Sequence, residues 1–240
     1  MATYLSSISF LANPGKSYAS DWSPFVFSLT LPFAIWIASK WFIPLYRNQV
    51  KTTAYEYLEQ RFALWARLYM STAYILLQIG RFAVVLYLTA LALAALLDVD
   101  IKMLILALGL LTIIYTLLGG FAAVIWTDVV QAVVLFFGGL LCLFILLTNM
   151  PGGWEQLSAV ASRENKFALG SMDFDLVIQG FWVIFIFGIV ENLKNFSGDQ
   201  NYIQRFLSAP SEAEAKKALW LGGLLYIPVS ALFFLIGTVL

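Results

Sequence analysis

The stretch RLYMSTAYILLQIGRFAVVLYLTALALAALL, residues 67–97, carries one charged side chain inside an otherwise largely apolar run, that of Arg81. In a helix, which rises about 1.5 Å per residue, Arg81 lies roughly 21 Å from Arg67 and roughly 25 Å from Asp98, where the charged flanks begin. A guanidinium at that depth in hydrocarbon cannot reach water at either end, and leaving it uncompensated costs at least about 3 kcal/mol. Arg81 must therefore face protein, water or a bound anion, and it marks a candidate functional site.

The composition indicates that this hydrocarbon is a lipid bilayer. The chain is 61% hydrophobic and 12% charged, and its mean hydropathy is +0.85, more apolar surface than a soluble domain of this size can bury. The apolar runs do not alternate with period two, so they predict helices and not the strands of a barrel. We expect an all-α integral membrane protein with six full spans, at about 24–45, 64–97, 102–121, 124–149, 176–196 and 216–240.

The basic residues predict the orientation of these spans. With the 46–61 loop in the cytoplasm, the same side receives Arg47, Lys51, Arg61, Arg67, Arg205, Lys216 and Lys217. The opposite side receives Lys16, Lys102, Arg163 and Lys166 together with several aspartates. Because cytoplasmic loops carry the excess of Lys and Arg, this assignment is favoured.

Both ends of the sequence predict a fragment. Residues 1–12 are too short to span a membrane and resemble the second half of a helix, and the last apolar run reaches Leu240 without a polar tail. We therefore expect a single transmembrane domain over residues 1–240 that is truncated at both ends.

Polar groups interrupt the apolar runs at four places, and the first is residues 2–9, which include Ser6 and Ser9. Such serines either hydrogen-bond a carbonyl of their own helix or line the cavity of a broken helix, as in transporters. The second place is Gln78 and Arg81. Arg81 either pairs with a buried carboxylate such as Asp128 or recognises a carboxylated substrate, for which the planar guanidinium is suited.

The third place is GGFAAVIWTDVVQ, residues 119–131, where a Gly-Gly turn leads into a span carrying Asp128. Asp128 is either an acid favoured by the helix dipole or a carboxylate that coordinates or relays a cation. The fourth is ENLKNFSGDQNYIQR, residues 191–205. It is either a cytoplasmic loop or a helix that unwinds around Ser197-Gly198 to line a cavity. Further on, Ser211 is placed to cap the last helix.

Together these passages resemble the sodium:solute symporter family, which includes the sodium–glucose cotransporters. GGFAAVIWTDVVQAV (119–133) matches the family pattern GG-x-x-A-V-x-W-T-D-x-x-Q, GDQNYIQRFLSA (198–209) matches its D-Q-x-x-x-Q-R stretch, and TAYEYLEQRF (53–62) matches a loop after the second core helix. The Q-x-G-R run at Gln78-Ile-Gly-Arg81 is most similar to that of bacterial sodium–sialic acid symporters.

The resemblance implies a five-plus-five inverted repeat of the leucine-transporter type. Residues 1–12 would be the second half of core helix one, 22–149 would be core helices two to five, and 176–240 would be core helices six and seven. It implies sodium as the coupled ion, with the carbonyls of Ala2 and Leu5 at the main site and Asp128 assisting a second sodium.

The resemblance also implies where substrate binds: Ser6 and Ser9 would face it, and Arg81, with Gln78 beside it, would hold its carboxylate. Ile8-Ser9 and Asn195-Phe196 stand where sugar-transporting relatives have other residues, so glucose and galactose are disfavoured.

We expect sodium-coupled symport of an anionic solute such as sialic acid across a bacterial inner membrane, with no nucleic acid partner. A membrane sensor built on the same fold and an inactive fragment are the alternatives. An enzyme is disfavoured, because the chain has no His and no clustered Cys or carboxylates.

Overall fold

The computed structural model describes residues 8–50 and 53–240, and every regular element in these ranges is helical. Four helical stretches are long and apolar enough to cross a membrane: Ser23–Gln49, Leu64–Leu97, Ile101–Asn149 and Glu212–Val239. The elements are η2 Ile8–Ala12, α1 Asn13–Ala19, η3 Ser23–Phe25, α2 Val26–Leu29, α3 Leu31–Ile37, η4 Ala38–Phe42, α4 Ile43–Gln49, α5 Ala54–Arg61, α6 Leu64–Leu97, α7 Ile101–Asn149, α8 Gly153–Arg163, α9 Phe181–Gly198, α10 Gln200–Ser208 and α11 Glu212–Val239. The chain is a multi-pass membrane protein, as its sequence predicts.

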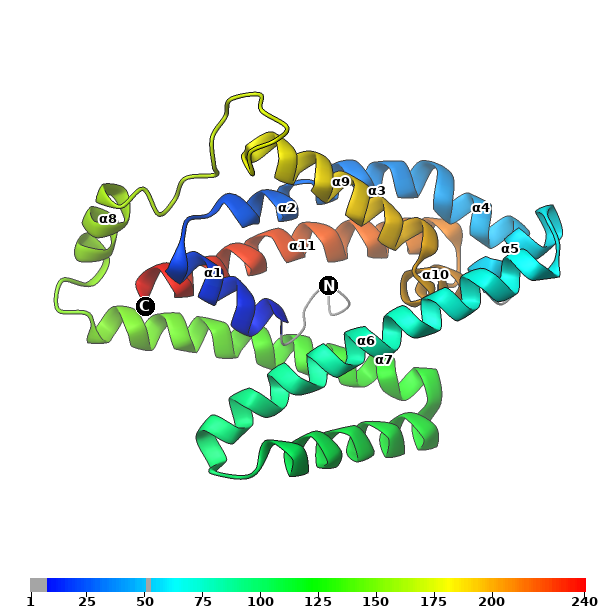
Figure 1. Ribbon diagram of the computed structural model, residues 1–240, viewed down its shortest axis with the longest axis horizontal. Helices are drawn as coiled ribbons and strands as arrows, with labels where there is room; N and C mark the ends of the chain where they lie inside the picture. The colour runs from blue at the N-terminus through cyan, green and yellow to red at the C-terminus, as the bar shows by residue number, and fades with distance from the viewer. Residues whose placement is uncertain (1–7, 51–52) are drawn as a thin grey trace.

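Helix α7 contains two of the predicted spans, 102–121 and 124–149, in one continuous assignment. Its backbone leaves the helical region at Gly120, where φ is 58° and ψ is −155°, a conformation open essentially to glycine alone. The helix turns back on itself there, so that its two arms run in opposite directions (Figure 1). The predicted Gly-Gly turn is confirmed.

The predicted span 176–196 begins later than expected. Helix α9 starts at Phe181, and the apolar residues before it lie in an exposed loop, with Val177 94% exposed. The Asp175 side chain accepts hydrogen bonds from the backbone of Val177 at 2.7 Å and of Ile178 at 3.4 Å. Aspartates that bind nearby backbone groups in this way compete with helix formation, which explains the delayed start.

The first helical segment also differs from its expected bounds. It was expected to end at residue 12, but η2 continues directly into α1 and reaches Ala19. Pro14 has no backbone N–H to donate to a preceding carbonyl. The π-helical turn over Ile8–Ala12 changes the hydrogen-bond register just before it, the kind of local adjustment by which helices accommodate a proline.

Polar contacts bring the loops together at two opposite ends of the molecule. At one end Arg47 donates hydrogen bonds to the carbonyls of Phe206 and Ala209, at 2.6 and 2.8 Å. At the other end the Lys166 ammonium donates to the carbonyl of Tyr18 at 2.7 Å. This pairing of loops matches the alternation of sides that the basic residues predict.

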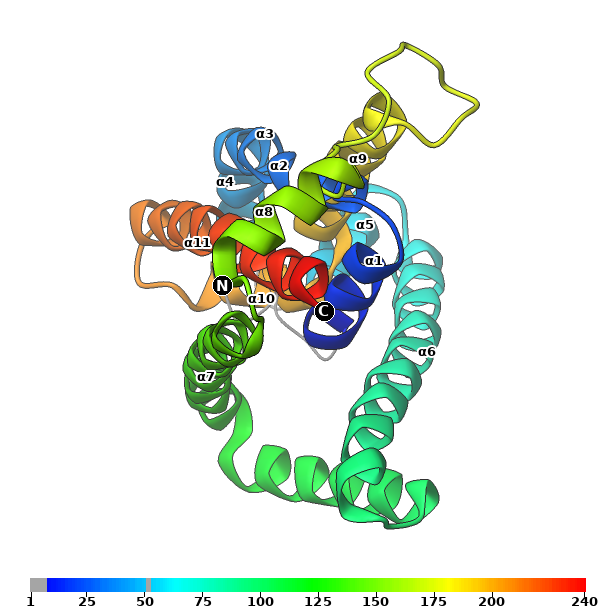
Figure 2. The same ribbon diagram turned by 90° about the vertical axis from the view of Figure 1, so that its left-hand side faces the viewer.

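Helix α11 is the most enclosed of the long helices, and over half (56%) of its most apolar window is buried. It packs against α1, α3, α4 and the second arm of α7, and Phe233 on it is 1% exposed. The corresponding windows of α6 and α7 are each only 6% buried. Figure 2 shows α6 and the first arm of α7 extending away from the remaining helices.

The contact between α1 and α11 depends on Gly237. A Cβ atom at this position would lie 2.1 Å from the carbonyl oxygen of Pro14, closer than any stable contact. The absent side chain lets the two backbones approach, as small residues do between membrane helices.

We predict that Gly237→Ala destabilises the protein by about 1–3 kcal/mol, because the added methyl group forces the helices apart. Thermal unfolding of the purified protein in detergent measures the effect. Gly15→Ala on α1 is the matched control, since a Cβ there meets nothing within 4 Å. Equal melting temperatures for the two variants would contradict the close approach.

Candidate functional site

The helix predicted to unwind near Ser197-Gly198 breaks one residue later. Helix α9 ends at Gly198, α10 begins at Gln200, and Asp199 between them is extended, with φ −85° and ψ 115°. Oδ1 of Asp199 accepts the backbone N–H of Asn201 at 2.9 Å, so the carboxylate caps the start of α10. A long cytoplasmic loop, the alternative interpretation, is therefore wrong for these residues.

Three tyrosines from three different helices donate hydrogen bonds to this break, and we refer to Tyr46, Tyr55 and Tyr74 as the tyrosine triad. Tyr46 on α4 donates to the carbonyl of Ser197. Tyr55 on α5 donates to the carbonyl of Gly198 at 3.1 Å, and Tyr74 on α6 donates to Oδ1 of Asp199 at 2.9 Å. Tyr46 and Tyr55 satisfy carbonyls that the end of α9 leaves without intrahelical partners, and Tyr74 holds the capping carboxylate.

The tyrosine triad was not found by sequence reasoning. Tyr55 lies within the TAYEYLEQRF motif, but nothing in the sequence alone pairs its hydroxyl with a residue more than a hundred positions away. Burial, and after it the neighbouring Tyr74 hydroxyl and Asp199 carboxylate, raises the pKa of Tyr55. The phenol therefore stays protonated and remains a donor across the neutral range.

Arg81 contacts the same break. Its Nη1 lies 3.4 Å from Oδ2 of Asp199, and one turn earlier Gln78 donates to the Tyr74 hydroxyl at 2.6 Å. The Arg81 side chain is 50% exposed, whereas that of Asp199 is only 10% exposed. The predicted neighbours Gln78 and Arg81 therefore lie together, and the carboxylate that pairs with Arg81 in the structure is Asp199 and not Asp128.

Asp128 forms an ion pair with Arg205 of α10. The two side chains are 24% and 31% exposed, so the pair is mostly shielded from solvent. The second arm of α7 starts after Gly120, which places Asp128 about two turns into it, beyond the first turn where the helix dipole acts. The dipole interpretation of Asp128 is therefore not supported, and the pair ties α7 to α10.

The remaining predicted residues belong to the first helical segment. Ala2, Leu5 and Ser6 lie outside the described residues. Ser9 is described and buried on η2, and η2 contacts both α6 and α11. Ser9 therefore belongs to an element packed against the helix that carries Gln78 and Arg81.

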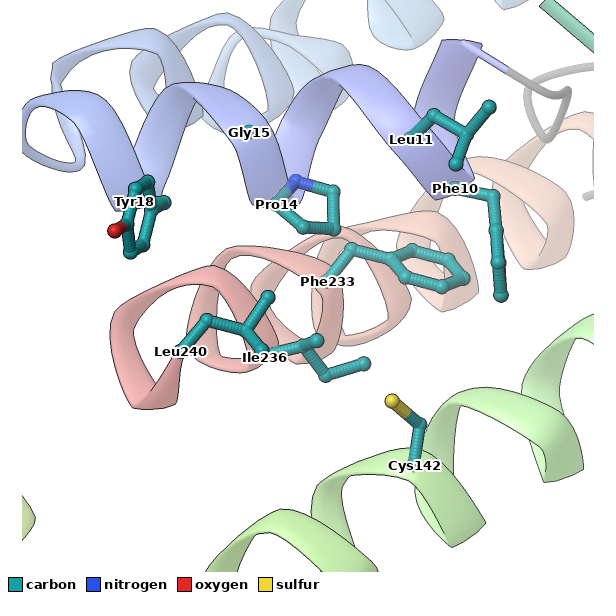
Figure 3. Close-up of a pocket in the computed structure, with 9 residues that line it drawn as sticks. All are labelled: Phe10, Leu11, Pro14, Gly15, Tyr18, Cys142, Phe233, Ile236 and Leu240. Carbon is teal, nitrogen blue, oxygen red and sulfur yellow. The ribbon is translucent and has the colours of Figure 1, made fainter. Parts of the chain in front are cut away.

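A cavity of about 560 Å³ lies apart from these polar groups, between η2 and α1, α11 and α7 (Figure 3). Its lining is almost wholly apolar: Phe10, Leu11, Pro14, Gly15, Tyr18, Cys142, Phe233, Ile236 and Leu240. Of the predicted site residues that the structure describes, which are Ser9, Gln78, Arg81 and Asp128, none lines it. Such a lining suits an apolar group and offers little to an ion.

Clustered metal-binding side chains are absent from the part of the chain that the structure describes: no three His, Cys, Asp or Glu residues gather there. The charged groups of the candidate site occur instead as two separate ion pairs, Arg81 with Asp199 and Arg205 with Asp128. Both pairs connect to α10: Asp199 of the first pair caps this helix, and Arg205 of the second pair lies in it.

The model of the sodium:solute symporter family matches residues 1–239. The chain is 36% identical to the sodium/sialic acid symporter NanT of Aliivibrio fischeri, and 36% identical to SiaT of Proteus mirabilis, in each case over 100% of this chain and 48% of the relative. It is 32% identical to the sodium-coupled monocarboxylate transporter 2 of Mus musculus, over 97% of this chain and 38% of that protein.

Among solved structures, a Na⁺-coupled sialic acid symporter in a substrate-bound, outward-open state has a TM-score of 0.93 and 33% sequence identity to this chain. The match covers 99% of this chain and 50% of that one. The chain thus spans about half the length of the relatives that it matches.

The Asp128–Arg205 pair gives a prediction about stability. Arg205→Gln leaves the shielded Asp128 carboxylate without its partner, and we expect a double-mutant cycle with Asp128→Asn to give a coupling of about 1 kcal/mol. Thermal unfolding in detergent provides the four values. The more exposed Glu191–Lys194 pair is the control, with an expected coupling below about 0.5 kcal/mol; equal couplings in both cycles would rule out a special contribution of Asp128–Arg205.

Proposed function

Given that this chain belongs to the sodium:solute symporter family, we propose that it functions in sodium-coupled symport of a small carboxylated solute. The observation that carries this proposal is Arg81. Its guanidinium is placed in the middle of α6, is half exposed, and has a single long contact, at 3.4 Å, with Asp199 among the described residues. An arginine retained at that depth and open on one side is suited to bind an anion.

The names of the relatives support a carboxylate. Sialic acid and monocarboxylates are the substrates in the names of three similar proteins, and both carry a carboxylate group. A carboxylate accepts two parallel hydrogen bonds from a guanidinium. We therefore propose sialic acid as the first substrate to test, held by Arg81 and Gln78 on α6 with Ser6 and Ser9 on the first helical segment.

Sodium is the proposed coupling ion. The carbonyls of Ala2 and Leu5 would supply the main site, because sodium is a hard cation and oxygen atoms are suitable ligands. Asp128 would assist a second ion. Since its carboxylate is paired with Arg205, that ion would have to share or replace the guanidinium, which would link ion passage to movement of α10.

The proposed architecture is part of a five-plus-five inverted repeat. Residues 1–12 would belong to core helix one, 22–149 to core helices two to five, and 176–240 to core helices six and seven. The protein would lie in a bacterial inner membrane, with lipid, sodium and the solute as partners and no nucleic acid, and it would carry out no enzymatic reaction. Sodium and substrate would favour the same state of the helices through a coupling free energy of typically 1–3 kcal/mol.

The first test of this function is the ion dependence of uptake. Proteoliposomes containing the protein at its native length should accumulate labelled sialic acid when an inward sodium gradient is imposed. Replacing sodium by choline at equal ionic strength should remove accumulation. Equal uptake in both solutions would exclude sodium-coupled symport.

The second test is the role of Arg81. Arg81→Ala removes the guanidinium, so we expect uptake of sialic acid to fall at least about tenfold, the loss of one charge-assisted contact of more than 1.4 kcal/mol. Arg61→Ala is the matched control, because Arg61 is an exposed residue of α5 whose Nη1 donates to Tyr57. Full uptake of sialic acid by the Arg81→Ala variant would contradict the proposal that Arg81 forms the carboxylate site.

A further inference from the structure

We propose that Asp199 is an internal competitor of the substrate: its carboxylate holds Arg81 when the site is empty and gives up the guanidinium when a carboxylated solute arrives. This inference rests on the proposed role of Arg81 as the carboxylate site. It adds to that role a specificity-determining residue on a different element, at the break between α9 and α10.

The two partners of this ion pair are held very differently. Asp199 is fixed by two hydrogen bonds that do not involve Arg81, from the Tyr74 hydroxyl and from the backbone N–H of Asn201, both at 2.9 Å. Its side chain is only 10% exposed. The carboxylate therefore keeps its position and its cap on α10 when Arg81 moves away.

Arg81 is the mobile partner. Its side chain is 50% exposed, and its contact with Oδ2 of Asp199 is 3.4 Å long, beyond the 2.7–2.9 Å of a strong charge-assisted hydrogen bond. A guanidinium has five N–H donors in a planar fork. A solute carboxylate that meets two of them in parallel makes a stronger pair than this single long contact, so exchange from Asp199 to the solute is favourable.

Such an exchange selects for charge. A solute with a neutral group in place of the carboxylate cannot offer the guanidinium a second anion, so it leaves the Arg81–Asp199 pair intact. A carboxylated solute replaces one anion by another, and the guanidinium is never left without a partner. Only a solute that competes successfully with Asp199 for Arg81 therefore binds to the guanidinium.

The exchange also couples substrate binding at Arg81 to the contact between α6 and the helix break. Arg81 and Tyr74 both connect α6 to Asp199. When Arg81 turns to the solute, one of these two connections is lost and the hydrogen bond from Tyr74 remains. Binding at α6 therefore loosens the contact with the residue that joins α9 to α10.

Competition of this kind lowers the apparent affinity of the protein for its substrate, because only the fraction of molecules whose Arg81 is not paired with Asp199 is ready to bind. Asp199→Asn removes the competing charge but keeps the shape and the capping oxygen of the side chain, because asparagine is as good an N-cap as aspartate. We expect the half-saturation concentration for sialic acid uptake to fall roughly two- to fivefold, as for the loss of one partly exposed ion pair.

Two comparisons separate competition from a structural effect. The methyl ester of sialic acid has no carboxylate, so its half-saturation concentration for binding should be the same in the variant and the unchanged protein. Glu191→Gln, which removes a partly exposed carboxylate from α9 about two turns before the break, should leave the value for sialic acid unchanged. Asp199→Ser also caps a helix without charge, so it should reproduce the effect of Asp199→Asn. It is the variant to test if Asp199→Asn fails to fold.

A rise in the half-saturation concentration for sialic acid in Asp199→Asn would show that Asp199 orients Arg81 for substrate, and no change would show that it is not involved; either result overturns the proposal. Equal shifts for the acid and its ester would do the same. Arg81→Ala keeps this outcome separate from the proposed function. If that variant loses uptake while Asp199→Asn behaves like the unchanged protein, the carboxylate site stands and only the competition fails.

Discussion

The structure depends on how the chain satisfies the backbone groups that are exposed where α9 stops and α10 begins. An interrupted helix leaves carbonyls at one end and N–H groups at the other, and neither set can remain unpaired away from water. Here Tyr46 and Tyr55 of the tyrosine triad supply donors to the carbonyl side. The Asp199 carboxylate supplies the acceptor for the N–H side and is itself held by a hydrogen bond from Tyr74. Because the donors come from α4, α5 and α6, satisfying this one break fixes three other helices around it.

Burial is distributed unevenly over the long helices, and this separates two kinds of role. Helix α11 is enclosed by neighbours, and its glycine at 237 sets the distance to α1. Helices α6 and α7 present most of their apolar surface outward, and they carry the charged side chains of the candidate site, Arg81 and Asp128. The enclosed helix provides a rigid support, whereas the polar groups that would meet a solute or an ion lie on helices with fewer packing constraints.

Local patterns in the sequence predicted most of the helices and some of their ends. The turn at Gly120 and the cap at Ser211, which accepts the N–H of Glu214 at 3.1 Å, both follow from the residue type at a single position. The late start of α9 could have been inferred from Asp175, a residue that often binds its own backbone. The continuation of the helix from η2 into α1 through Asn13-Pro14 was not predicted. A proline signals a helix break unless the hydrogen-bond register of the preceding turn changes.

The candidate site was harder to predict, because it is made by contacts between distant parts of the sequence. Arg81 was identified by its depth in an apolar run, a property that one segment reveals. Its partner was not, since Asp128 and Asp199 are equally available in sequence and only the approach of α6 to the break between α9 and α10 selects Asp199. Contacts of distant segments with the same break, and no local signal, assemble the tyrosine triad.

The single cysteine of the chain offers an experimental advantage. Cys142 projects from α7 into the apolar cavity, facing Phe233 and Ile236 of α11 (Figure 3). A thiol-reactive fluorophore or spin label would therefore attach at one site without removal of other cysteines. The label would sit between the well-packed helix α11 and the sparsely packed helix α7, where its spectrum would follow the separation of the two during any rearrangement.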